Sequence, residues 1–302
     1  MRVAVVGVTG AVGTEILRVM EQREFPVSEL LPLASPRSAG KTVQFAGKEW
    51  TVREVNEDAF ENVDVVLFSA GATRSRQFVP AALSAGAIAI DNSSAFRMDS
   101  DVPLVVPEIN GGALRARKTQ GVIANPNCAA ILLTMVLHPL RALGKMERVV
   151  VSTYQSTSGA GALAMEELIA QTRGYLLGDE PAPQVFQWPI AFNLFSHNSD
   201  VEENGYNGEE NKVMEETRKI LDLPSLPISV TCVRVPILRA HCEAVNIEFD
   251  REVDEADVRN VLGAMPGVRV VDERGSNRFP MPRETAGGDE VWVGRIRRDQ
   301  GH

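Results

Sequence analysis

One cysteine, Cys128, stands where a strand pattern gives way to a helix pattern, and that position could make its thiol a nucleophile. The apolar run 122–124 ends at Asn125-Pro126-Asn127, and a continuous apolar helix pattern starts at Cys128. Because proline bars helix before it and asparagine is a strong N-cap residue, Cys128 is predicted in the first helical turn. The partial positive charge and backbone N–H groups of that turn stabilise a thiolate. The alternative is a small buried cysteine that only fills space.

The other two cysteines, Cys232 and Cys242, are predicted to be packing residues. Cys232 lies within an apolar strand pattern, and Cys242 alternates with His241. Their spacing with His241 lacks any zinc-like signature, so we expect no metal site. Three cysteines are an odd number without a disulfide-framework spacing, which indicates a reducing cytosol.

A glycine-rich loop at residues 7–13, GVTGAVG, follows the first predicted strand and opens the first predicted helix. Glycines there allow a tight turn, close approach of the backbone to a phosphate and close helix–strand packing. The start of the helix would then face a pyrophosphate. The spacing is GxxGxxG rather than GxGxxG, and an ordinary glycine-rich turn is the alternative. Its position predicts dinucleotide binding.

The end of the second predicted strand discriminates between the two nicotinamide dinucleotides. NAD sites usually place an aspartate or glutamate there to hold the ribose 2′-hydroxyl. Here residues 34–41 read ASPRSAGK, without a carboxylate. Arg37, Ser38 and Lys41 could clasp a 2′-phosphate, although a solvated basic loop is the alternative. The segment therefore favours NADP.

These residues must be positioned by two different kinds of sheet. Over the first part of the chain, strand patterns at 2–6, 30–34, 64–68, 87–91, 104–106 and 121–124 alternate with helix patterns at 11–22, 57–61 and 75–85. This alternation predicts an α/β domain with a doubly wound parallel sheet, a Rossmann fold. From Val149 on, strand patterns at 149–155, 228–235 and 244–249 and helix patterns at 160–176, 209–221 and 254–264 predict an α+β domain on a mixed or antiparallel sheet. Residues 178–189 contain three prolines and are predicted to form a loop.

Length and composition agree with two domains, which we place at 1–127 for dinucleotide binding and 128–302 for catalysis and dimerisation. The 302 residues are 44% hydrophobic and 24% charged, which suits a globular protein with a large core. A net charge of −9 argues against nucleic acid or an anionic membrane as partner. No stretch approaches the ~20 apolar residues of a membrane span, and no signal peptide is visible, so we expect a cytoplasmic protein.

Ten segments in order resemble the aspartate-β-semialdehyde dehydrogenases, and the resemblance covers nearly all of the chain. They are GVTGAVG (7–13), SPRSAGK (35–41), DNSSAFR (91–97), VPEIN (106–110), NPNC (125–128), YQSTSGAG (154–161), FNLFSHN (192–198), GYNGEENKVMEETRKIL (205–221), RVPILRAHCE (234–243) and VGRIRRD (293–299). Acetylglutamyl-phosphate reductases are similar in plan but differ from NPNC, and the SCTTN-type segment of glyceraldehyde-3-phosphate dehydrogenases is absent.

The resemblance implies a role for each matching position. Cys128 would be the nucleophile, His241 the general acid/base, and Gln155 the residue that orients the substrate near the thiol. The substrate would be bound by Arg234 at its carboxylate, by Glu209 near its amine, and by Arg97 and Lys212 at its phosphate. NADP contacts would come from Gly7, Thr9, Gly10, Ala11, Val12, Gly13, Arg37, Ser38, Ser158 and Gly159.

The spacing of these residues allows such a site but also other interpretations. His241 follows Arg234 by seven residues across a turn with Pro236, so both could project from paired strands into one cleft. A histidine with an ordinary pKa near neutrality can take and return the thiol proton. A hydrogen-bonded core histidine and a surface arginine are the alternatives. Lys212 lies in a highly charged helix pattern, which otherwise indicates a solvated face with i,i+4 ion pairs.

The implied reaction is the NADPH-dependent reductive dephosphorylation of L-aspartyl 4-phosphate to aspartate semialdehyde, in lysine, methionine, threonine and diaminopimelate biosynthesis. A cysteine thiolate attacks the acyl phosphate, and the resulting thioester remains electrophilic. Backbone N–H groups at the start of the Cys128 helix are candidate donors to the tetrahedral oxygen. The family forms homodimers or homotetramers through the second domain.

Two other functions remain open on the sequence. One is another acyl-phosphate or aldehyde reductase with the same thioester chemistry, and the other is a non-catalytic NADP-binding protein. The second draws on the end of the chain at Arg298-Asp299-Gln300-Gly301-His302, where family members continue. Their tail, which returns to the cofactor domain and supplies an amide to NADP, is expected to be absent here.

Overall fold

The chain divides into two compact units, Met1–Pro126 and Asn127–His302. The structure, a computed structural model, describes residues 1–115, 121–179 and 182–301. Residues 180 and 181 of the expected loop 178–189, and His302 of the expected chain end, lie outside the described residues.

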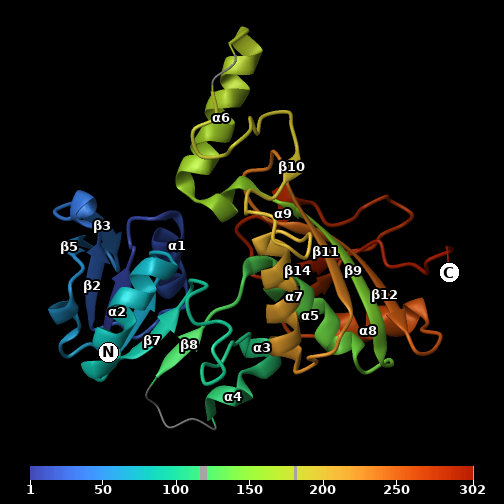
Figure 1. Ribbon diagram of the computed structural model, residues 1–302, viewed down its shortest axis with the longest axis horizontal. Coiled ribbons are helices and arrows are strands. Elements are labelled where there is room, and N and C mark those ends of the chain that lie inside the picture. The colour runs from blue at the N-terminus through green and yellow to red at the C-terminus, as the bar shows by residue number, and fades with distance from the viewer. Residues whose placement is uncertain (116–120, 180–181, 302) are drawn as a thin grey trace. The chain divides into compact units, whose positions relative to one another are not determined.

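Six parallel strands form the sheet of the first unit, in the order β5-β2-β1-β6-β7-β8 (Figure 1). They are β1 Arg2–Val6, β2 Glu29–Ala34, β5 Arg53–Glu54, β6 Val65–Phe68, β7 Ile88–Asp91 and β8 Val122–Ala124. Val3, Ala4, Val5 and Val6 of the central strand have no exposed surface, so both faces of the sheet are covered, as parallel sheets require. The predicted Rossmann-type sheet is confirmed.

Two long helices, α1 Ala11–Gln22 and α2 Ala72–Ser84, belong to this unit. Leu17 and Met20 of α1 pack against Val3 and Val5 of β1. The hairpin β3 Thr42–Phe45 and β4 Lys48–Thr51 adds Phe45 to the same core and was not predicted. Short helical turns complete the unit at η1 Pro36–Ser38, η2 Glu57–Phe60, α3 Pro107–Asn110 and α4 Gly112–Arg115.

The strand predicted at 104–106 does not form. Leu104 makes only an isolated bridge to Ala124, and Pro103 and Pro107 flank the apolar run. Proline cannot donate to a strand ladder, and Pro107 instead occupies the first turn of α3, where its missing N–H costs nothing.

Four strands form the main sheet of the second unit, in the order β10-β11-β9-β12. They are β9 Met146–Gln155, β10 Phe195–Ser196, β11 Ile228–Arg234 and β12 Cys242–Phe249. β11 runs parallel to β9, whereas β12 is antiparallel to β9 and β10 is antiparallel to β11, so the predicted mixed sheet is confirmed. β9 lies between β11 and β12, so the expectation that Arg234 and His241 come from paired strands was wrong.

Helices cover this sheet and extend beyond it. α5 Cys128–Leu140 and α7 Gly208–Leu221 pack against each other, with α7 also against β11 (Figure 1). α6 Ala162–Leu177 projects away from the sheet, and Glu167 near its middle accepts the N–H of Gln184 at 3.0 Å, which fixes the returning segment. The remaining elements are η3 Thr157–Ala160, α8 Glu255–Ala264, β13 Val268–Val270, α9 Pro282–Thr285 and β14 Val291–Val293.

None of the helices described is both long and apolar enough to cross a membrane.

A buried carboxyl group in the sheet of the second unit sets up a measurable pH dependence of stability. Glu243 of β12 pairs with Thr153 of β9, and within the described chain its buried Oε1 has no hydrogen-bond partner. Burial raises the pKa of Glu243 to about 8. The native state therefore holds a proton that the unfolded chain releases above its ordinary pKa near 4.5.

Because the native state binds the extra proton, Glu243 contributes a stability that is complete below pH 4.5 and is lost as pH rises toward 8. The difference between the folded and unfolded pKa values of Glu243 corresponds to a loss of unfolding free energy of about 5 kcal/mol at most. We expect Glu243→Gln, which keeps the size of the side chain and never ionises, to have a higher unfolding free energy than the unsubstituted protein at pH 8 and a similar one near pH 5. Chemical denaturation at both pH values measures this, and equal curves at pH 8 would contradict it.

Candidate active site

Cys128 is the first residue of α5, as predicted from the preceding Asn-Pro-Asn. Oδ1 of the N-cap residue Asn127 accepts the N–H groups of Ala129 at 2.9 Å and Ala130 at 3.4 Å. The thiol of Cys128 is exposed, so the alternative of a buried space-filling cysteine was wrong. The capping bonds also occupy the amides of Ala129 and Ala130, which removes these two from the expected oxyanion donors.

The turn before Cys128 is held by two glutamates of α7. Nδ2 of Asn127 donates to Glu209 Oε1 at 2.8 Å, and its backbone N–H donates to Glu216 Oε2 at 2.5 Å. Hydrogen bonds to ionised groups are roughly twice as strong as neutral ones. The start of the helix that carries Cys128 is therefore held in place by α7.

The acidic residues of α7 are not all solvated, contrary to the expectation for this charged helix. Glu209, Glu210 and Glu216 are buried, and Glu209 and Glu216 share the helix face of Val213 at i, i+4 and i+7 spacing. Glu210 closes a capping box with Asn207 and accepts the N–H of Cys232 at 2.9 Å. These carboxylates lie on the apolar stripe and attach α7 to α5 and β11.

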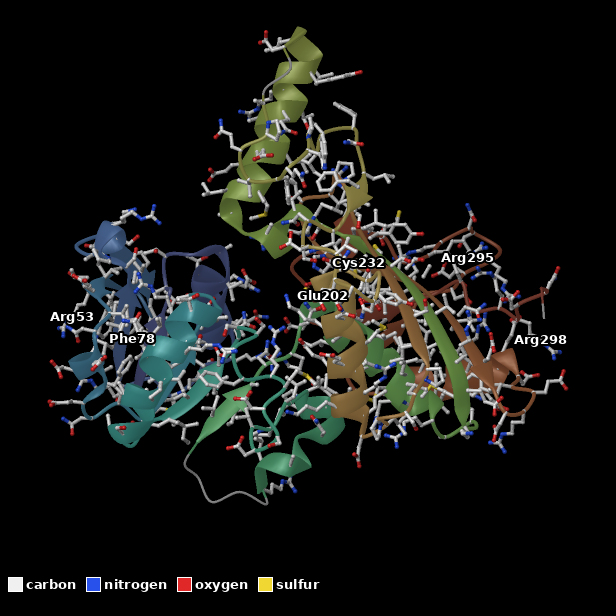
Figure 2. The ribbon with its side chains drawn as sticks, in the orientation of Figure 1. Arg53, Phe78, Glu202, Cys232, Arg295 and Arg298 are labelled. Carbon is white, nitrogen blue, oxygen red and sulfur yellow. The ribbon has the colours of Figure 1, made fainter. Side chains whose placement is uncertain are left out.

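Gln155 and Arg234 stand opposite each other at one edge of the sheet, because β9 and β11 are parallel and end in register. Gln155 is 1% exposed, and its Nε2 lies 3.4 Å from Glu209 Oε1 and 3.7 Å from Cys232 Sγ. Cys232 lies on β11 inside the second unit (Figure 2), and burial raises the pKa of its thiol to about 12. Cys232 is therefore an unreactive packing residue, as predicted.

Arg234 is a buried cation rather than a surface residue. Its side chain lies 5.5 Å from the ring of Phe186, its Nη1 donates to Ser156 O at 2.6 Å, and its Nε is buried without a hydrogen-bond partner among the described residues. Burial lowers the pKa of Arg234, and its electrostatic interactions with Glu209, Cys128 and Cys232 oppose this shift. Cys128 thus interacts electrostatically with Arg234, which brings the two predicted residues into one site.

His241 lies beside Arg234, immediately before β12. Its Nδ1 accepts the backbone N–H of Ser156 at 3.0 Å, so in the neutral ring the proton is on Nε2. Burial first, and then the charge of Arg234, lower the pKa of His241 to about 4. The expectation of a pKa near neutrality was wrong, because the imidazole is removed from water beside a cation.

Gly159 makes the close approach of these two side chains possible. A Cβ on Gly159 would lie 3.2 Å from His241 Nε2 and 3.3 Å from Arg234 Nη1. Gly159 and the nearby Ser158, whose Oγ lies 3.0 Å from Ser156 Oγ, were expected as cofactor contacts. Within the second unit, they line the site of His241 and Arg234.

We expect Gly159→Ala to displace His241 or Arg234 by a few tenths of an ångström, because both are held by hydrogen bonds to Ser156. Since a misplacement of about 1 Å can lower the rate about 100-fold, we expect this smaller displacement to lower kcat/KM about 10-fold. Gly263→Ala is the matched control, since a Cβ there meets nothing within 4 Å on α8. Steady-state kinetics of both variants test this, and unchanged kcat/KM in Gly159→Ala would contradict it.

Glu209 and Lys212 offer opposite charges one helical turn apart. Lys212 Nζ lies 3.8 Å from Glu209 Oε2, and the Lys212 side chain is 41% exposed. Burial alone would raise the pKa of Glu209, but its electrostatic interaction with His197, the hydrogen bond from Asn127 and the charge of Lys212 lower it overall. Glu209 is therefore ionised and able to bind an amine, while Lys212 reaches solvent.

The glycine loop of the first unit has the geometry of a phosphate cradle. Gly7 has φ +88°, and a Cβ there would lie 2.5 Å from Ser69 O, so only glycine fits. α1 begins at Ala11 after Gly10, and no side chain in the described part of the molecule caps its first turn. Such amides are available to a pyrophosphate. Thr9 Oγ1 donates to Ser38 Oγ at 3.3 Å, which brings the two predicted cofactor segments together.

The other predicted residues of the first unit are placed as follows. Arg37 lies exposed in η1, and Val12 is 43% exposed on α1. Arg97 is buried, and its guanidinium donates to the carbonyl groups of Asn125 and Asn92 at 2.9 Å each. Among residues 1–115, 121–179 and 182–301, no group of three His, Cys, Asp or Glu side chains could hold a metal ion.

The sequence analysis missed three features of this site. They are His197, Glu216 and the hydrogen bond from Asn127 to Glu209. His197 follows β10, and its Nε2 lies 2.8 Å from Arg234 Nη2. The helical spacing of Glu216 with the apolar residues of α7 could have predicted that Glu216 is buried. No local pattern marks His197, because its partner lies 37 residues away.

Two family models match most of the chain. "Semialdehyde dehydrogenase, NAD binding domain" matches residues 2–117, and "Semialdehyde dehydrogenase, dimerisation domain" matches residues 137–302. The aspartate-semialdehyde dehydrogenase of Synechocystis is 50% identical over 302 residues, covering 100% of this chain and 89% of the relative. That of Bacillus subtilis is 44% identical and covers 99% of this chain and 88% of the relative.

Solved structures of aspartate semialdehyde dehydrogenases are also similar to this chain. A crystal structure of aspartate semialdehyde dehydrogenase II from Vibrio cholerae matches with a TM-score of 0.95 and 43% identity, covering 100% of this chain and 89% of that chain. A second structure of that protein, complexed with ASA, matches with a TM-score of 0.93 and 42% identity over the same shares.

Proposed function

Since this chain belongs to the aspartate-semialdehyde dehydrogenase family, we propose that it reduces L-aspartyl 4-phosphate to L-aspartate 4-semialdehyde with NADPH, through a thioester on Cys128. One observation carries the proposal. Asn127, in the turn before the exposed Cys128, is hydrogen-bonded to the buried Glu209, and the buried Arg234 and the neutral His241 belong to the same site. Lysine, methionine, threonine and diaminopimelate biosynthesis in the cytoplasm is the proposed role.

The nucleophilic step follows from the position of Cys128. At the first position of α5, the positive end of the helix favours the thiolate. The thiolate attacks the acyl carbon, the carbon–oxygen bond to phosphate breaks, and a thioester remains on Sγ. Bound NADPH supplies a hydride. Collapse of the resulting tetrahedral adduct releases the aldehyde and regenerates the thiolate.

His241 donates a hydrogen bond in this reaction. With Nδ1 committed to the Ser156 amide, the neutral ring presents its Nε2–H. We assign this N–H to the oxygen that becomes negative in the tetrahedral adducts, the position where a preorganised donor has its greatest effect. The amide of Gln155, fixed beside Glu209, orients the acyl group.

Charge complementarity selects the substrate. The buried guanidinium of Arg234 suits the α-carboxylate, the ionised Glu209 suits the α-amine, and the exposed ammonium of Lys212 suits the phosphate. Arg97 is proposed as the second phosphate ligand.

NADP is the proposed cofactor, held by the glycine loop through Gly7, Thr9, Gly10, Ala11, Val12 and Gly13, by Arg37 and Ser38, and by Ser158 and Gly159. We expect Arg37→Ala to raise the KM for NADP about 10-fold, the typical effect of losing a hydrogen bond to a charged group, with little change for NAD. Steady-state kinetics with both cofactors measure this, with NAD as the internal control. A preference of the unsubstituted protein for NAD would contradict the assignment.

A homodimer or a homotetramer, formed through the second unit, is proposed for the assembly. The family model for residues 137–302 describes a dimerisation domain. Exposed apolar side chains on α6 and the segment after it support this, namely Leu163, Tyr175, Leu176, Leu177, Phe192 and Leu194.

The activity is tested in the reverse direction. Reduction of NADP, followed by absorbance, should require both aspartate semialdehyde and phosphate. Comparison with other aldehydes, including acetylglutamate semialdehyde and glyceraldehyde 3-phosphate, separates this function from another acyl-phosphate reductase. No turnover of any aldehyde by folded protein would favour a non-catalytic NADP-binding protein.

A further inference from the structure

We propose that His197 is a positioning residue that holds the guanidinium of Arg234 as a neutral hydrogen-bond acceptor, so that Arg234 keeps its direction and its charge for the substrate carboxylate. The inference rests on the proposed function. His197 lies in the segment between β10 and α7, the segment in which Glu202 is labelled in Figure 2.

The contacts of Arg234 define what His197 does. Nη2 of Arg234 lies 2.8 Å from His197 Nε2 and 3.4 Å from Asn198 Oδ1, and Nη1 donates to Ser156 O at 2.6 Å. A guanidinium carries donors only, so Nε2 of His197 must be the acceptor. His197 is thus the short contact that fixes Nη2.

The opposite side of the imidazole agrees with this tautomer. With Nε2 unprotonated, the proton of the neutral ring is on Nδ1, 3.2 Å from Ser199 Oγ. Ser199 Oγ accepts the N–H of Glu209 at 3.0 Å and donates to Asn207 Oδ1 at 3.2 Å, so it can also accept from His197. The Ser199 N–H, 3.3 Å from Nδ1, is the one contact that this tautomer does not satisfy.

This chain of hydrogen bonds connects the two ends of the proposed substrate site. It runs from Arg234 through His197 and Ser199 to the N–H of Glu209 in the first turn of α7, and Lys212 follows one turn later on the same helix. The carboxylate anchor and the amine anchor are therefore set relative to each other by His197.

The neutral state of His197 is as important as its position. Burial lowers its pKa to about 4, with Arg234 and Lys212 acting in the same direction and Glu209 opposing them. The hydrogen-bond acceptors that contact the two Nη atoms of Arg234 are an imidazole, a carbonyl and an amide, all uncharged. The Nε of Arg234 is buried and has no hydrogen-bond partner among the described residues. This N–H and the positive charge of Arg234 therefore remain for an anionic ligand. A carboxylate in place of His197 would neutralise that charge.

The test uses three variants of the full chain. His197→Phe removes the acceptor, His197→Glu makes it anionic, and His197→Gln keeps a neutral acceptor near the same point. We expect the Phe variant to raise the KM for aspartate semialdehyde by about 10- to 100-fold, with kcat changed far less, the range for a lost hydrogen bond to a charged group. The Glu variant should raise this KM to a similar extent, because its carboxylate neutralises the charge of Arg234. The Gln variant should recover most of this loss.

The matched control is a substrate without the carboxylate, 3-aminopropanal. Its kcat/KM should be equal, within about 3-fold, in the unsubstituted protein and in the Phe and Glu variants, because Arg234 has nothing to bind. Equal loss with both aldehydes, or an unchanged KM for aspartate semialdehyde, would overturn the positioning role. If His197→Phe does not fold, His197→Glu carries the same comparison. Failure of the unsubstituted protein to turn over aspartate semialdehyde would instead overturn the proposed function.

Discussion

Cys128→Ser should abolish turnover, with a loss in kcat on the order of 10⁴-fold or more, the scale seen when a catalytic nucleophile is removed. A serine hydroxyl is not ionised at the start of a helix near neutral pH, and no thioester can form. The affinity for NADP should stay within a few fold, because the substitution changes none of the proposed NADP contacts in the glycine loop, at Arg37 and Ser38, or at Ser158 and Gly159. Steady-state kinetics and NADP titration by fluorescence measure the two quantities.

Cys242→Ser is the matched control for this variant. Cys242 is half-buried on β12, and burial, together with Glu243, raises the pKa of its thiol. We expect this variant to retain activity within a few fold and to leave iodoacetamide labelling of Cys128 intact. Full activity in Cys128→Ser would end the account of the nucleophile.

Replacing His241 should lower kcat without removing the thiolate. If Nε2–H stabilises the tetrahedral oxygen, His241→Leu should lower kcat by about 10²- to 10³-fold, as for other preorganised donors to an oxyanion. His241→Gln places an amide N–H near the position of Nε2 and should lose less. Steady-state kinetics with saturating substrates measure both variants.

The tautomer gives this prediction a second readout. Because Nδ1 accepts the Ser156 N–H, the neutral ring does not offer an unprotonated nitrogen at Nε2. The rate of Cys128 labelling by iodoacetamide at neutral pH should therefore change by no more than a few fold in His241→Leu. A collapse of the labelling rate would show that His241 is the base that generates the thiolate.

The sequence was most informative where the signal is local. Alternating apolar runs predicted the parallel sheet of the first unit, and Asn-Pro-Asn predicted the start of α5 at Cys128. Here the residues that decide the structure are neighbours in the chain. Proline decided against the strand at 104–106, although its apolar pattern alone favoured one.

Long-range pairing could not be predicted in the same way. Arg234 ends β11 and His241 precedes β12, the two strands that flank β9, and both side chains bond to Ser156 just after β9. This strand order depends on contacts between segments about 80 residues apart. The charges of α7 were misjudged for a related reason. Glu209 and Glu216 are buried because Asn127, from a distant turn, supplies donors to both.

Electrostatic properties were the least predictable part of the candidate site. The expected pKa of His241 assumed contact with water, whereas burial beside Arg234 lowers it to about 4. Glu243 and Glu209 are both removed from water, yet their pKa values move in opposite directions. Glu209 has hydrogen bonds from Asn127 and Gln155 and the nearby charge of Lys212, which offset burial, whereas burial alone acts on Glu243.

A single-turnover experiment without phosphate tests the nucleophile most directly. Aspartate semialdehyde and NADP are mixed with the protein, NADPH formation is followed by absorbance, and the quenched protein is digested and analysed by mass spectrometry. We predict a burst of one NADPH per subunit and an aspartyl adduct on the peptide that contains Cys128, both lost in Cys128→Ser. Turnover without a burst, or an adduct on a different residue, would contradict a thioester at Cys128.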